Sequence, residues 1–315
     1  MSLVPETTRR ALRKAEATSG KLKRAATSRG ATLAAFIIAA IWTLPTLGLF
    51  ISSFREANDI KTSGWWTAFA NPSFTLENYA KALNSGDSLT LSKAFVNSLA
   101  ITIPAAVVPI ILASLAAYAF AWINFKGRNT LFVAVFALQI VPIQMALVPL
   151  LQLFSDGVQI GGLYILPGLG VNGLEGAYAK VWIAHTIFAL PLAIFMLHNF
   201  ISEIPGEVIE AARVDGAGHG QIFYRIILPL AMPAIASFGI FQFLWVWNDL
   251  LVATVFTSGT ELPITKALQD LSGTYGQSWE LLTAGAFISM IIPLLVFFAL
   301  QRFFVRGLLA GATKG

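Results

Sequence analysis

Cysteine is absent from this sequence and charged residues are scarce, and both features narrow what the chain can do. Without Cys, a disulfide framework, a Cys-ligated zinc site and thiol catalysis are excluded. Charged residues make up 12% of the 315 residues and hydrophobic residues 56%, whereas soluble domains carry roughly 25% charged residues. So little charge cannot cover a water-soluble globule, which argues against a soluble enzyme, a disordered protein and a nucleic-acid binder. The composition predicts a polytopic membrane protein.

The sequence also lacks a nucleotide-binding motif. It contains no GxxxxGK[ST] pattern, and therefore no phosphate-cradling loop of that type. The three histidines are scattered, with no carboxylate at metal-ligand spacing, so we expect no metal site. We accordingly expect no catalytic residue and no cofactor in this chain. If ATP powers its work, a different chain hydrolyses the ATP.

Six apolar segments are long enough to cross a bilayer core of roughly 30 Å. They show no period-two alternation, so we expect helices, which satisfy their own backbone hydrogen bonds in lipid. Each contains at least one proline, which kinks a helix. The expected spans lie near residues 31–54, 94–122, 130–154, 181–201, 230–256 and 281–304. The predicted fold is an all-α polytopic membrane protein with one six-span domain over 31–315, preceded by a tail over 1–30.

Basic residues indicate the orientation. Most of the 21 Lys and Arg lie in the 1–30 tail, the 124–129 turn, the 202–229 loop and the C-terminal end. Because cytoplasmic loops carry an excess of Lys and Arg, we expect these segments and both termini to be cytoplasmic. The basic tail has no aromatic residues that would stack on bases. We therefore expect membrane lipid, rather than nucleic acid, beside it.

The 202–229 loop predicts a short amphipathic helix on the cytoplasmic side. Glu207 and Glu210 suit the positive N-terminal end of such a helix, and Glu210 can pair with Arg213 three residues later. Gly216 tolerates the positive φ with which many helices end. The small residues that we expect to share one exposed face are Val208, Ala211 and Ala212. A small-faced helix of this kind is a docking element.

The same loop carries a recognisable motif. The pattern EAA-x3-G-x9-I-x-L-P is formed by Glu210, Ala211, Ala212, Gly216, Ile226, Leu228 and Pro229. It resembles the EAA loop in the membrane subunits of binding-protein-dependent ABC importers. So many fixed positions rarely coincide by chance, and the loop falls between the fourth and fifth expected spans, which is the right context.

Further segments narrow the resemblance to carbohydrate importers of the maltose/trehalose type, in particular to the smaller, six-span permease of the pair. These segments are 74–79, Asn97-Ser98, 117–119, 125–128, Trp247-Asn248 and 307–315. The resemblance runs from about residue 31 to 315. The basic tail and a Gly-rich insert over 155–178 depart from the family pattern.

The resemblance implies the transmembrane fold of a type I ABC importer in the inner membrane of a bacterium or archaeon. It implies four kinds of partner: a homologous second permease, an ATPase dimer that binds ATP and Mg, an extracytoplasmic solute-binding protein, and the sugar itself. It also implies that the loop helix seats in a cleft of the ATPase. The coupling residues would be Glu210, Ala211, Ala212, Asp215 and Gly216. The end over 307–315 resembles a tail that reaches the ATPase, with a simple solvated end as the alternative.

Polar residues inside the spans are candidates for the solute pathway. Asp249 within a span would cost roughly 2.5–3.5 kcal/mol at the bilayer centre, so it should face the bundle interior or water. With its neighbours Trp245, Trp247 and Asn248 it could form a wall that suits sugar rings and hydroxyls. The alternative is a helix-end residue near the outer surface. Gln144 and His185 are further candidates, although interhelical hydrogen bonds explain most polar groups in spans.

Two rival functions remain. A permease for another solute, such as glycerol phosphate, would favour Arg or Lys well inside a span, and the sequence places none there. An ion-coupled secondary carrier would need paired intramembrane ionisable groups and usually internal repeats. We therefore predict a sugar permease that carries out no covalent chemistry itself.

Overall fold

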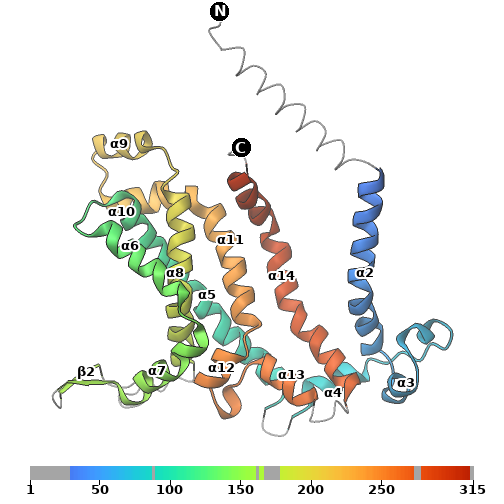
Figure 1. The fold of residues 1–315 in the computed structure, drawn as a ribbon. Helices are drawn as coiled ribbons and strands as arrows, with labels where there is room; N and C mark the ends of the chain where they lie inside the picture. Colours follow the sequence, from blue (N-terminus) through green and yellow to red (C-terminus); the bar gives the residue numbers. More distant parts are fainter. Residues whose placement is uncertain (1–28, 87–88, 161–162, 167–177, 273–277, 313–315) are drawn as a thin grey trace, which may run out of the picture. The chain divides into compact units, whose positions relative to one another are not determined.

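Helices form nearly all of the described chain (Figure 1). The computed structural model describes residues 29–86, 89–160, 163–166, 178–272 and 278–312. Within these ranges, residues 158–160, 163–166, 272 and 302–312 are described by their backbone only. The chain divides into two compact units, Met1–Leu76 and Glu77–Gly315.

The first unit is one long helix followed by a small folded segment. Its elements are α2 (Arg29–Ser53), α3 (Ala57–Thr62) and the 3-10 turn η1 (Trp65–Phe69). Arg55 organises the segment, because its buried guanidinium donates to the Asp59 carbonyl and to the hydroxyls of Ser63 and Thr67. Trp65 lies against α2 where Gly48 leaves room: a Cβ at Gly48 would lie 2.7 Å from the indole Nε1.

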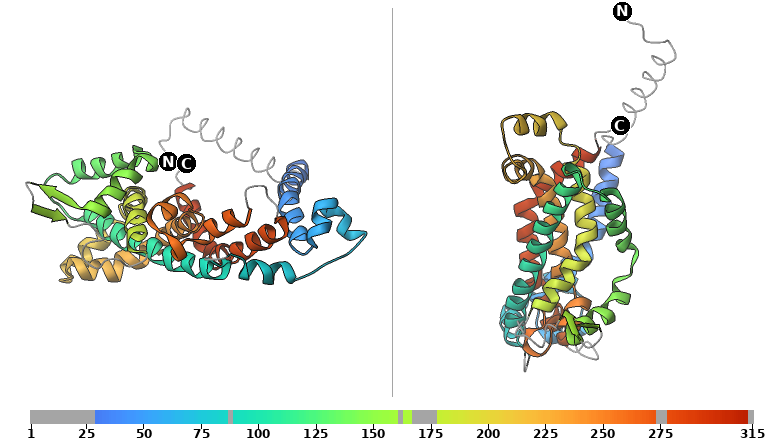
Figure 2. Two further views of the ribbon diagram at one scale, coloured as in Figure 1. Left: turned by 90° about the horizontal axis from the view of Figure 1, so that it is seen from below. Right: turned by 90° about the vertical axis from the view of Figure 1, so that its left-hand side faces the viewer.

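The second unit is built on four long helices. They are α5 (Leu91–Trp122), α8 (Ala179–Ile201), α11 (Leu228–Trp247) and α14 (Trp279–Ala312). α5, α8 and α11 lie side by side (Figures 1 and 2). α5 and α8 run in the same direction. Near their N-terminal ends the Trp182 indole donates to the Ala100 carbonyl, and at their C-terminal ends the Trp122 indole donates to the Ile201 carbonyl.

Shorter elements flank these helices. They are α4 (Glu77–Asn84), α6 (Arg128–Ala137), η2 (Leu138–Ile140), α7 (Ile143–Asp156), α9 (Gly206–Val214), α10 (His219–Ile222), η3 (Phe223–Ile227), α12 (Leu251–Phe256), η4 (Gly259–Glu261) and α13 (Ile264–Ser272). α9 and α10 lie at one end of the long helices, and α12, α13 and α4 lie at the opposite end (Figure 1). We call these the α9 end and the α13 end.

The apolar helices confirm an all-α polytopic fold. In the described residues five helices are long and apolar enough to cross a membrane, and a bent pair makes up to six. The pair corrects the expected continuous span over 130–154, because its two helices, Arg128–Ile140 and Ile143–Asp156, meet at 104°. The cause is Pro142, which forces the preceding Val141 into an extended conformation, with ψ at 119°.

The expected fifth span also needs correction. Instead of one helix over 230–256, a helix runs over His219–Trp247, stops, and restarts as α12. It begins early because a π-helical turn over Phe223–Ile227 absorbs Pro229, whose ring would clash with a regular helix. The chain restarts as α12 because the Asp249 carboxylate captures the first free N–H groups of the new helix.

The predicted insert over 155–178 contains a short antiparallel hairpin. Its strands are β1 (Val158–Ile160) and β2 (Leu163–Leu166). Residues 161–162 and 167–177 of the insert, nearly all of the 1–30 tail and the side chains of the 307–315 end lie outside the described residues.

Candidate functional site

The helix predicted within the 202–229 loop is α9, and its C-terminal end has the expected form. Gly216 adopts φ +81. Its N–H donates to the Arg213 carbonyl at 3.0 Å, and the Ala217 N–H donates to the Ala212 carbonyl at 2.9 Å. These two bonds form a Schellman motif, which requires a left-handed residue at this position. The predicted role of Gly216 as the helix terminator is confirmed.

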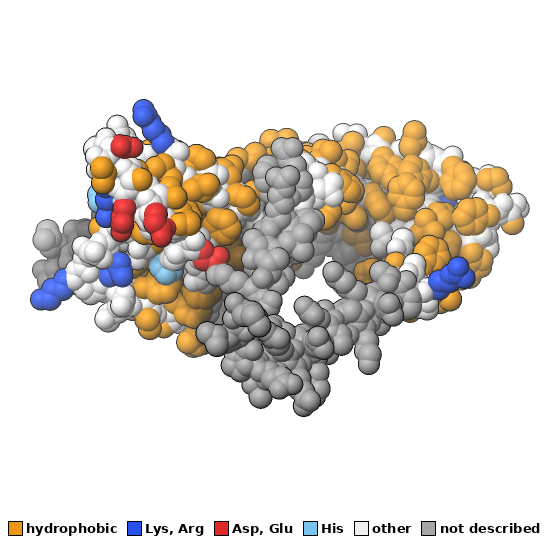
Figure 3. All heavy atoms as spheres, turned by 90° about the horizontal axis from the view of Figure 1, so that it is seen from above, with side chains coloured by type: hydrophobic (Ala, Val, Ile, Leu, Met, Phe, Trp, Pro, Cys, Tyr) orange, Lys and Arg blue, Asp and Glu red, His pale blue; other side chains and the backbone are white. Residues whose placement is uncertain are grey.

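α9 has one packed face and one exposed face. Ile209 is 1% exposed, and Ala212, three residues later, packs against the same core. Val208 and Ala211 are exposed as expected, whereas Ala212 faces the core, which corrects the expectation that all three share one exposed face. Exposed positions are Glu207, Val208, Glu210, Ala211, Arg213, Val214, Asp215 and Gly216. Figure 3 shows the acidic side chains gathered over this part of the molecule, on the left of the view.

Val214 is the residue of this face that sequence reasoning missed. Its side chain is 87% exposed, although Val is usually buried. The helical spacing from Glu207 through Glu210 and Ala211 to Val214 was the available signal. The exposed face of α9 thus combines apolar and acidic side chains, with Val214 next to Asp215 at its C-terminal end.

Two side-chain hydrogen bonds join the loop to α5, which is not its neighbour in sequence. The Tyr118 hydroxyl lies 2.9 Å from Nδ1 of His219 on α10. The Arg213 guanidinium donates to the Trp122 carbonyl at 3.2 Å. In the described part of the chain no ion pair joins Arg213 to Glu210, so that expectation was wrong: the guanidinium reaches the free carbonyl at the end of α5 instead.

A cavity of about 830 Å³ lies between the α6–α7 bend, α8 and α11. Most of its lining is aliphatic or aromatic, and none of the lining residues carries a charge. Its polar lining groups are two glutamines and an indole, namely Gln139, Gln242 and Trp245. Gln242 is 3% exposed and its amide donates to the Ala105 carbonyl at 3.0 Å, which fixes the side chain at the wall.

The predicted pathway residues separate in the structure. Trp245 lines the cavity. Trp247 does not: it is 2% exposed, and its indole donates to the Ser289 carbonyl and stacks on Phe243. Gln144 is exposed and is not among the lining residues. Gln139, from the same bent pair of helices, lines the cavity instead. Asn248 is the C-cap of α11, and its side-chain amide donates to the Leu244 carbonyl.

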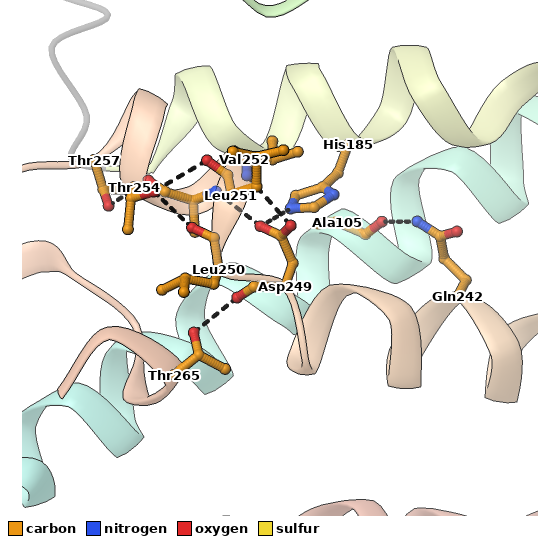
Figure 4. Close-up of polar contacts among 11 residues, drawn as sticks. Ala105, His185, Gln242, Asp249, Leu250, Leu251, Val252, Thr254, Thr257 and Thr265 are labelled. Atoms are coloured by element: carbon orange, nitrogen blue, oxygen red, sulfur yellow. Dashed lines mark hydrogen bonds and ion pairs between the residues drawn. The ribbon is translucent and has the colours of Figure 1, made fainter. Parts of the chain in front are cut away.

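Asp249 and His185 lie beside the cavity wall. The Asp249 carboxylate accepts from the N–H groups of Val252 at 3.2 Å and Ala253 at 2.8 Å, so it caps α12. This geometry agrees with the helix-end interpretation of Asp249. His185, fully buried on α8, points toward this carboxylate with Nε2 3.6 Å from Oδ2 (Figure 4).

At the α13 end, Asn97 joins three segments. Its amide donates to the carbonyls of Thr260 and Leu262, and its oxygen accepts from the Tyr178 hydroxyl at 2.8 Å. Burial, and then the nearby Glu261, raise the pKa of Tyr178, which keeps the hydroxyl protonated as a donor. Sequence reasoning gave Asn97 only as a family mark, because its partners are distant in the chain.

The sequence of this chain matches a known family of transport proteins. The family described as "Binding-protein-dependent transport system inner membrane component" matches residues 109–309, which include the cavity, α9 and α10. The chain belongs to this family. It is therefore a permease component of an inner-membrane transport system, as the loop motif predicted.

Relatives cover nearly the whole chain. The osmoprotective compounds uptake permease protein GgtD of Synechocystis sp. is 52% identical, over 90% of this chain and 91% of that protein. The alpha-glucoside transport system permease protein AglG of Rhizobium meliloti is 48% identical, over 84% and 68% respectively. A solved bacterial ABC transporter for alginate import has the same fold, with a TM-score of 0.63 at 18% identity over 88% of this chain and 98% of that one.

Proposed function

We propose that this chain is one of two permease subunits of an ATP-driven importer for a small glycoside or oligosaccharide. The observation that carries the proposal is the uncharged cavity, in which an indole and two amides stand among apolar side chains. Indole faces suit the apolar faces of sugar rings, and amides donate to and accept from hydroxyls. The name of the alpha-glucoside relative supports the same solute class.

The lining argues against the rival solutes. Glycerol phosphate carries charge that a site would meet with Arg or Lys, and no Arg or Lys lines this cavity. An ion-coupled carrier would place ionisable groups in the pathway. Among the described residues, His185 and Asp249 form an ionisable pair close to the cavity, but neither residue belongs to its lining. Both Asp249 carboxylate oxygens already accept backbone N–H groups.

The exposed face of α9 is the proposed contact with an ATPase subunit. Its Val214 offers apolar area, and Glu210 and Asp215 offer charge, without participation in this chain's own packing. ATP and Mg would bind to that partner, not to this chain. The α9 end would face the cytoplasm, as the basic residues of the 124–129 turn and the 202–229 loop favour. A second permease and an extracytoplasmic solute-binding protein complete the assembly.

In the proposed mechanism, closure of the ATPase dimer moves α9. The Tyr118–His219 and Arg213–Trp122 contacts carry this movement to α5, while the continuous helix from His219 carries it to α11. Since α8 and α11 line the cavity, the movement alters access to it. ATP binding and hydrolysis thus bias an equilibrium between inward-open and outward-open states.

Transport by the purified complex tests this proposal. The chain is isolated from native membranes with its companions, which mass spectrometry identifies, and the complex is placed in liposomes that enclose ATP and Mg. We expect an ATPase and a second permease, and uptake of a labelled glucoside that excess glycerol 3-phosphate does not inhibit. A complex without an ATPase, or uptake of a quaternary ammonium osmolyte but of no sugar, would overturn it.

A further inference from the structure

We infer that His185 is a positioning residue that sets the Trp245 indole in the cavity wall, and that it does not contact the solute. This inference rests on the proposed function, because it concerns the affinity of the same cavity for its solute. His185 is absent from the cavity lining, while Trp245 belongs to it.

His185 touches both sides of the break between α11 and α12. Its ring meets the Trp245 ring edge-on, with centroids 5.5 Å apart and an interplanar angle of 86°. Its Nε2 lies 3.6 Å from Asp249 Oδ2 (Figure 4). Trp245 belongs to the last turn of α11, and Asp249 caps α12. One side chain of α8 therefore holds both helix ends next to the break.

The burial of His185 makes this contact consequential. The side chain is fully buried, and neither ring nitrogen has a hydrogen-bond partner among the described residues. A buried imidazole without such partners is costly, and the nearby carboxylate is the compensation that it has. Trp245, by contrast, is 37% exposed, and it lines the cavity.

Trp245 lies in the last turn of α11, so its backbone is helical, and the edge-on contact with His185 orients its side chain. α11 ends at Trp247 and α12 begins at Leu251. Edge-to-face aromatic contacts contribute specific geometry beyond buried area. His185 therefore determines how far the indole stands into the cavity, and so determines the fit to a sugar ring.

A double-mutant cycle on uptake KM tests the inference in the intact transport complex. His185→Ala should raise KM by roughly two- to tenfold, the range for an aromatic contact, with Vmax nearly unchanged. His185→Gln should raise it less, since the Gln amide still reaches Asp249. In a Trp245→Ala background, His185→Ala should add less than about twofold, because the two act as one unit. The matched control is His198→Ala on the same helix, whose ring lies 4.3 Å from that of Phe132 and outside the lining.

Each contrary result has its own meaning. If the two substitutions multiply in KM, His185 acts on the solute independently of Trp245, and the inference is wrong. If His185→Ala lowers complex yield or Vmax with KM unchanged, its role is purely structural, and the inference is wrong. If Trp245→Ala alone leaves KM unchanged for every sugar transported, the cavity is not the solute pathway, and the proposed function of this site falls with it.

Discussion

Tyr118, on α5, and His219, on α10, share a hydrogen bond of 2.9 Å although 101 residues separate them. Tyr118 is 4% exposed, and its ring also lies against Phe223 at the start of the π-helical turn. Because the loop is connected directly to α8 and α11 but not to α5, this contact gives the loop a second route into the bundle.

Tyr118→Phe should uncouple ATP hydrolysis from uptake. It removes one hydroxyl and keeps the ring, so the loss is that of one hydrogen bond, about 0.5–1.5 kcal/mol. We expect two- to tenfold less solute transported per ATP hydrolysed in liposomes, with normal assembly. Tyr224→Phe, at a side chain 65% exposed, is the control and should leave the ratio unchanged. An equal loss in both variants would contradict the route through α5.

Gly216→Ala should weaken ATPase binding, whereas Gly220→Ala should not. An added Cβ meets nothing within 4 Å at either glycine, so packing is not at issue. Gly216, however, adopts φ +81, where a Cβ costs roughly 1–2 kcal/mol. The helix end should therefore shift, and co-purification of the ATPase should fall by about tenfold. Equal effects from the two substitutions would show that the left-handed turn plays no part.

Val214→Asp should abolish ATPase co-purification without loss of this subunit from the membrane. The side chain is 87% exposed, so the substitution leaves the packing of the described chain intact. A charge placed in an apolar contact is left without a partner when the two proteins meet. Val214→Ala keeps the surface apolar and should retain most binding. Full binding by the Asp variant would place the ATPase contact elsewhere.

Asp249→Ala should destabilise the folded subunit by about 0.5–2 kcal/mol, the usual loss for a helix cap. The substitution leaves the N–H groups of Val252 and Ala253 without their acceptor. Thermal unfolding in detergent measures the change. Asp270→Ala, at an exposed ion pair with Lys266, is the matched acidic control, and its midpoint should barely move. A midpoint shift no larger than that of the control would remove the capping role.

Local rules in the sequence predicted the spans and the end of α9 well. Hydropathy sufficed to locate the long helices, and a glycine after the last helical residues predicted the positive φ of Gly216. Both features depend on residues close in the chain. The bend at Pro142 was harder, since a proline gives a kink but not its angle, which packing sets. From the sequence, Trp245 and Trp247 had the same predicted role in the cavity wall. Two positions along a helix differ in direction by roughly 200°, so the Trp247 side chain instead contacts Phe243 and the Ser289 carbonyl.

The length of α5 gives the molecule a lever arm. At 32 residues it extends about 48 Å, well beyond the roughly 30 Å of a bilayer core. One end is tied to α10 through Tyr118, and Asn97 ties the other to the segment before α13. A tilt of about 10° in a rod of that length displaces its far end by roughly 8 Å. In the proposed mechanism, a tilt of α5 driven from the α9 end would therefore move the segment that Asn97 holds at the α13 end.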